Sequence, residues 1–155
     1  MTRFTSFRKV ALAVAALAVL GGLPAVAAHP VPFQGRADLV VTGAEFTSST
    51  TLVLSASATG QATHLGRFTR TETITADLPS GTFTGTVTFT AANGDQLNAD
   101  VTGHFTSPTL DSAEGTYTFT SASSGRFKNA SGQAAFVVKP NGTSLGVTFK
   151  GTIQY

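Results

Sequence analysis

The sequence predicts an all-β domain, most simply an antiparallel up-and-down barrel of about eight strands. Beyond His29, apolar side chains recur at every second position, and no stretch repeats them at helical spacing over three turns. Short turn sequences rich in Gly, Asn, Pro and Asp separate the alternating segments, so successive strands are expected to pair with each other. Such strands, with one apolar face each, close naturally into a barrel, and a β-sandwich is the alternative architecture.

The first half of this domain contains the clearest strand pattern. Three segments of alternating hydrophobicity come first, over residues 37–46, 51–59 and 68–76. Gly35, Gly60 and the turn-forming segment 77–81 are expected to mark their boundaries. Residues 82–90 follow, with threonines on one face and, on the other, Phe83, Gly85, Val87 and Phe89.

The second half repeats the pattern. Asn93 and Gly94 tolerate the backbone of a tight hairpin turn, so residues 96–105 are expected to pair with the strand before them. Further strands are predicted over residues 115–120, 134–138 and 145–155, with a turn at 139–143. Because most connections are short, neighbouring strands should be antiparallel throughout.

Ahead of the domain, residues 1–28 have the features of a cleavable signal peptide. A basic start precedes an uncharged apolar run over residues 10–20, which is far shorter than the roughly 20 residues of a membrane-spanning helix. Small residues then allow cleavage near Ala27 or Ala28. We therefore expect residues 29–155 to form one secreted or periplasmic domain, which meets a membrane only through the leader before cleavage.

The composition narrows the possible functions. The chain has no cysteine, which removes thiol nucleophiles, thiolate metal sites and disulfides together. Of its 10 Lys and Arg residues three lie in the leader, which leaves seven against 8 Asp and Glu and a net charge of about −1. Without a basic cluster, no nucleic-acid partner is expected. The 3 histidines show no metal-ligand spacing, so we expect neither a metal nor a cofactor.

One predicted strand carries charge on its apolar face. If Phe68 faces the interior, the same alternation directs His64, Arg70 and Glu72 inward. A buried charge costs several kcal/mol unless it is paired. Arg70 and Glu72 should therefore form an ion pair with each other or with a ligand. The pair could orient a carboxylate-bearing ligand, or Glu72 could act as an acid or base. Alternatively, both side chains lie near the barrel mouth and meet water.

The candidate ligand-binding residues combine this polar group with inward aromatic side chains. They are Arg70, Glu72, His64, Phe68, Phe83, Phe89, Phe105 and Phe119. Glu72 is the weak candidate for a catalytic role, ahead of Glu45 near the predicted barrel rim. A binding function of this kind predicts an open lumen with a pocket of about 300 Å³ or more, and a lumen packed solid would count against it.

Several short segments resemble the allene oxide cyclase-like barrel, a calycin-type group that includes dirigent proteins. They are residues 62–69, 92–95, 124–132 and 149–153, so the resemblance spans most of the domain from about Gly60. It implies an exported bacterial member with a calycin-type barrel. The group contains plant cyclases that act on a fatty-acid epoxide, proteins that steer phenoxy-radical coupling, and bacterial relatives without an assigned activity.

The sequence leaves four functions open. It favours a barrel that binds a small apolar or amphipathic ligand in its lumen, and leans away from catalysis. The alternatives are a cyclase or isomerase that uses Glu72 with Arg70, a structural or surface-interaction module without a pocket, and a small outer-membrane barrel. The last of these requires the phenylalanine-bearing face to point outward to lipid. Neither the ligand nor the oligomeric state follows from the sequence.

Overall fold

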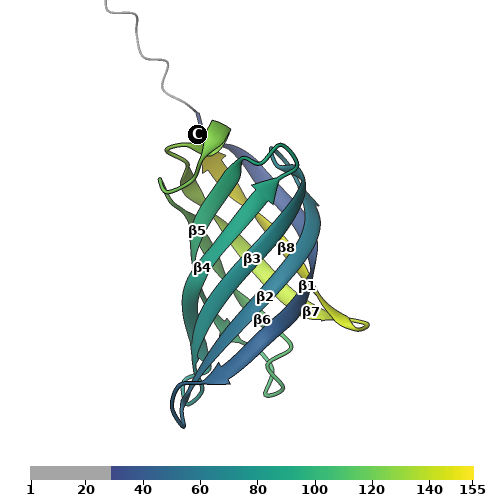
Figure 1. Cartoon of the computed structure of the whole chain (residues 1–155), viewed down its shortest axis with the longest axis vertical. Helices are drawn as coiled ribbons and strands as arrows, with labels where there is room; N and C mark the ends of the chain where they lie inside the picture. The colour runs from purple at the N-terminus through teal and green to yellow at the C-terminus, as the bar shows by residue number, and fades with distance from the viewer. Residues whose placement is uncertain (1–28) are drawn as a thin grey trace, which may run out of the picture.

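A computed structural model describes residues 29–155, and the predicted signal peptide lies outside these residues. The described chain is a closed barrel in which each strand pairs antiparallel with the next and β8 returns to β1 (Figure 1). The strands are β1 (Val31–Phe46), β2 (Thr51–Ala62), β3 (Gly66–Asp77), β4 (Thr82–Ala91), β5 (Gln96–Phe105), β6 (Ala113–Phe119), β7 (Ser131–Asn141) and β8 (Ser144–Gln154), with one 3₁₀ turn, η1 (Gly125–Phe127). The prediction of an all-β up-and-down barrel is therefore confirmed, and the β-sandwich alternative is wrong.

Strand alternation sets the two faces of the barrel wall. On β4, Phe83, Val87 and Phe89 are buried in the lumen, while Thr82 and Thr84 are exposed outside. The outer-membrane alternative required the phenylalanines to point outward and the threonines inward. The structure shows the opposite, so that expected arrangement is wrong. No helix among residues 29–155 is long and apolar enough to cross a membrane.

Two glycines that were expected to end strands lie inside them instead. Gly35 is in β1, opposite Phe149 of β8, and Gly60 is in β2, opposite Phe68 of β3. A Cβ atom at Gly35 would come within 2.6 Å of the Phe149 ring, and one at Gly60 within 2.7 Å of the Phe68 ring. Each glycine thus makes room for an aromatic ring from the next strand, which is a reason for glycine within a strand other than a turn.

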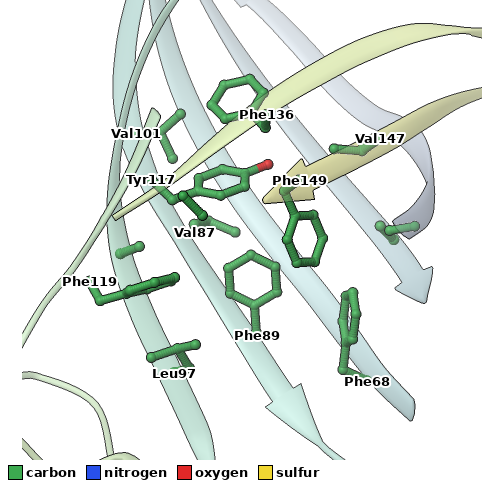
Figure 2. Packing of buried hydrophobic residues seen from close by; sticks show 14 of the residues in the cluster. Phe68, Val87, Phe89, Leu97, Val101, Tyr117, Phe119, Phe136, Val147 and Phe149 are labelled. Carbon is green, nitrogen blue, oxygen red and sulfur yellow. The ribbon is translucent and has the colours of Figure 1, made fainter. Parts of the chain in front are cut away.

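One end of the barrel is packed with aromatic rings. Figure 2 shows Phe68, Phe89, Phe119 and Phe149 converging in the interior from different strands. The ring centroid of Phe33 lies 5.0 Å from that of Phe119 and 5.3 Å from that of Phe149. Leu65 and Phe127, in the turns at this end, are also buried. We call this the closed end.

The other end is incompletely walled. Pairing between β1 and β8 stops at Leu39 and Leu145, whereas β1 continues to Phe46 along β2 alone. The β7–β8 hairpin projects away from the barrel there, as the yellow ribbon in Figure 1 shows. Val40, Val41 and Phe46 on the free part of β1 are consequently exposed. We call this the open end, and it includes the β5–β6 loop, residues 106–112.

Candidate functional site

The polar group inside the barrel comes from β3. Arg70 and Glu72 follow Phe68 at alternate positions, so all of them point into the lumen, as predicted. In the strand register, Arg70 lies opposite Ala58 of β2 and Glu72 opposite Ala56. These small neighbours leave room for two long side chains on the inner face.

Arg70 and Glu72 form a buried ion pair between the guanidinium Nη2 and the carboxylate Oε2. The exposed fractions of the two side chains are 2% and 10%. The guanidinium carbon also lies 5.1 Å from the ring centroid of Tyr117 and 5.5 Å from that of Phe89. Contact with the negative faces of these rings offsets part of the cost of removing the cation from water.

The pair leaves part of Arg70 without a partner. Its Nε and Nη1 atoms are buried and have no hydrogen bond within the described protein, and the same is true of the Tyr117 hydroxyl. Burial lowers the pKa of Arg70, but Tyr117 and Glu72 outweigh this effect and the pKa is raised. Burial also raises the pKa of the Tyr117 phenol, so it stays protonated. The site therefore offers unused donors in an apolar environment, where leaving them unpaired is costly.

A cavity of about 60 Å³ lies beside this group, toward the open end. Arg70 and Glu72 line it together with the apolar side chains Leu39, Val41, Leu54, Ala56, Ile74, Phe83, Val101, Phe105, Leu110, Ala113, Phe136, Val138 and Leu145. Val41 is 45% exposed and Leu110 is half-buried, so this region borders solvent. The expected lumen pocket of about 300 Å³ or more is therefore wrong, because aromatic rings fill most of the interior and leave only this small cavity.

The structure divides the predicted site residues between two regions. Phe83 and Phe105 line the cavity with Arg70 and Glu72. Phe68, Phe89 and Phe119 are buried in the packing of the closed end and do not line the cavity, although the Phe89 ring centroid lies 5.5 Å from the Arg70 guanidinium carbon. Their inward orientation was predicted, but alternation alone carries no information about depth along the barrel.

His64 is placed differently from the prediction. It lies in the β2–β3 turn at the closed end, before β3 begins at Gly66, so the alternation does not extend to it. Its Nε2 donates to the Pro32 carbonyl oxygen at 3.1 Å, and its Nδ1 lies 3.0 Å from the Tyr155 hydroxyl, which donates to it. The backbone φ of His64 is +67°, a turn conformation. The expected inward position of His64 is therefore wrong.

Two important residues were absent from the predicted site. Tyr117 is buried on β6, where its ring is stacked on Phe136 with 4.4 Å between the ring centroids and lies 5.1 Å from the Arg70 guanidinium carbon. Leu110 belongs to a loop with no periodic pattern, and its φ of +59° is unusual for leucine. A single buried tyrosine hydroxyl among apolar neighbours was the available sequence signal for the first.

No protein-family model matches the chain, and no curated protein matches its sequence. Among residues 29–155, no group of three or more His, Asp or Glu side chains is placed to hold a metal ion.

Proposed function

We propose that this protein is a binding barrel that takes a small apolar or amphipathic molecule into the cavity at its open end. The single observation that carries the proposal is the pair of unused donor atoms on Arg70, buried at the wall of a cavity lined otherwise by apolar side chains. Binding sites of small molecules combine these two properties, an apolar surface and a few fixed polar groups.

The size of the cavity limits the ligand. A volume of about 60 Å³ corresponds to roughly two water molecules in the liquid, so it admits a body of only a few non-hydrogen atoms. A longer molecule would have to extend through the open end past Val41 and Leu110. We propose in addition that the protein is secreted or exported to the periplasm. We also propose that it is a member of the allene oxide cyclase-like group.

A cyclase or isomerase role for Glu72 has less support. A general acid or base must exchange a proton with its substrate, whereas the Glu72 carboxylate is held by the Arg70 guanidinium. In this arrangement Glu72 serves as a counter-ion, which stabilises Arg70 inside the barrel.

The proposal is tested by NMR titration of the protein with small organic molecules, using Ala56→Leu to fill the cavity. Ala56 is buried and lines the cavity, whereas its neighbour Ser57 is exposed, so Ser57→Leu is the matched control. We expect amide shifts at the cavity-lining strands in the parent protein and in Ser57→Leu, and their loss in Ala56→Leu. If acetone, isobutene, acetate and isopropylammonium all leave these amides unshifted, the binding proposal is wrong.

Mass spectrometry gives a second readout on the same variants. A molecule that co-purifies with the parent protein from its native culture medium should be missing from Ala56→Leu and present in Ser57→Leu. Equal amounts in both variants would place that molecule outside the cavity.

A further inference from the structure

We infer that the ligand is electrically neutral and presents a hydrogen-bond acceptor oxygen, of the kind found in a ketone, aldehyde, ester or ether, to the guanidinium of Arg70. This inference rests on the proposed binding function and specifies the chemistry of its site. It follows from the free donor atoms, the local balance of charge and the apolar lining.

The free polar atoms of Arg70, which belongs to the cavity lining, are donors. Arg70 Nε and Nη1 carry N–H groups, and a guanidinium has no acceptor. The nearby Tyr117 hydroxyl, also without a partner, can donate as well. A ligand that pairs with Arg70 must therefore offer an acceptor. A hydrocarbon would leave the N–H groups unpaired, and burying unpaired donors is costly.

The charge of Arg70 is already compensated. Glu72 is in direct contact with the guanidinium, so the pair adds no net charge to the lumen. A carboxylate ligand would add a second negative charge beside Glu72 in a region of low dielectric constant, where like charges repel strongly.

The open end as a whole also disfavours an anion. The carboxylates at this end are Glu45 at the end of β1, Asp77 at the end of β3, Asp111 in the β5–β6 loop and Glu114 at the start of β6. Lys139 on β7 is the lysine there, and His104 is paired with Glu114 at 3.3 Å. An approaching anion therefore meets an acidic rim, while a neutral molecule is unaffected by it.

The lining determines the rest of the ligand. The walls around Arg70 are formed by side chains such as Leu54, Val101 and Phe136, which offer no polar atom. The body that extends from the acceptor oxygen should accordingly be aliphatic and compact. A cation gains nothing from Arg70, and could interact only with Glu72 at the expense of the existing pair.

The test compares acetone, isobutene, acetate and isopropylammonium, which have the same number of non-hydrogen atoms and differ in charge and in acceptor. Their dissociation constants are measured by NMR from amides lining the cavity. We expect acetone to bind more tightly than either ion. Acetate as the tightest ligand would overturn the inference in favour of an anion site, and isopropylammonium as the tightest would overturn it in favour of Glu72.

A variant pair then tests the role of Arg70. Arg70→Met combined with Glu72→Leu removes both charges together, and Arg67→Met, on the exposed face of β3, is the matched control. We expect the ratio of the isobutene to the acetone dissociation constant to fall about tenfold in the double variant, as the loss of a hydrogen bond to a charged group predicts, and to stay constant in the control. An unchanged ratio in the double variant would overturn the inference while leaving the binding function intact. Failure of all four probes to bind the parent protein would instead remove the binding function itself.

Discussion

The closed and open ends of this barrel are built from the same strands with the same alternation, yet one is solid and the other holds a cavity. At the closed end the inward positions carry phenylalanines, and Leu65 and Phe127 cover them from the turns. At the open end Phe83, Phe105 and Phe136 are interspersed with aliphatic side chains and enclose a cavity. There β1 runs beyond the end of its pairing with β8, and a charged pair from β3 lies at the boundary between the two ends.

The difference teaches that the tightest aromatic packing and the cavity are separated along the barrel axis. Rings in contact from several strands bury a large apolar area, which is the main favourable contribution to folding. With that area supplied at one end, the other end tolerates an imperfect wall and unpaired donors. We expect substitutions to have effects that decrease from the closed end to the open end.

The largest effect should come from Phe89→Ala at the closed end. The Phe89 ring is fully buried, and its centroid lies 5.4 Å from that of Phe68 and 5.6 Å from that of Tyr117. Truncation should lower the free energy of unfolding by about 4 kcal/mol, because it removes buried area and leaves a cavity. Urea denaturation measures this free energy. A loss below about 1 kcal/mol would contradict the conclusion that the closed end contributes most of the stability.

Glu72→Gln, at the boundary between the two ends, should lower the free energy of unfolding by about 3 kcal/mol. It leaves the Arg70 charge buried without a counter-ion, which is more costly than removing both charges. The double substitution Arg70→Met with Glu72→Leu should recover most of this loss. Denaturation of Arg70→Met, Glu72→Leu and their combination completes a thermodynamic cycle, and additive effects on the free energy of unfolding would show that the pair is not coupled.

Leu110→Gly, at the open end, should change the free energy of unfolding by less than about 1 kcal/mol. The half-buried leucine loses apolar contact, but glycine adopts the φ of +59° without the penalty that leucine pays there. Leu110→Ala loses the same contact without relief of the backbone and should be less stable than Leu110→Gly by about 1 kcal/mol. The reverse order in thermal denaturation would contradict a strained loop.

The smallest effect concerns the pH dependence of the β5–β6 loop. The Ser107 hydroxyl donates to Asp111 Oδ1 at 2.6 Å, and this bond, with smaller contributions from Thr109 and Ser112, lowers the pKa of Asp111 from 3.8. The lowered pKa stabilises the folded loop above pH 3.8, and this contribution is lost as the pH falls from 3.8 through the folded-state value. Hydrogen exchange of the loop amides should therefore increase in this acidic range in the parent protein, and Asp111→Asn should abolish that dependence.

The sequence by itself determined the strand order and the two faces of the wall. Alternation on β4 is enough to place Phe83 and Phe89 inside, because successive side chains in a strand point to opposite sides. The same local rule placed Arg70 and Glu72 in the lumen. It failed at His64, where the chain turns, and at Gly35 and Gly60, which alternation and turn preference describe equally well.

Only the tertiary structure decided which inward residues surround the cavity and which fill the closed end. Depth along the barrel depends on strand tilt and register between partners far apart in the chain, such as Leu39 with Leu145. The same pairing brings Tyr117 of β6 to Arg70 of β3 and leaves the end of β1 without β8 beside it. The charged pair was visible in the sequence as an exception to a pattern, but its free donors and its cavity exist only once the barrel is closed, because both depend on which neighbours the remaining strands supply.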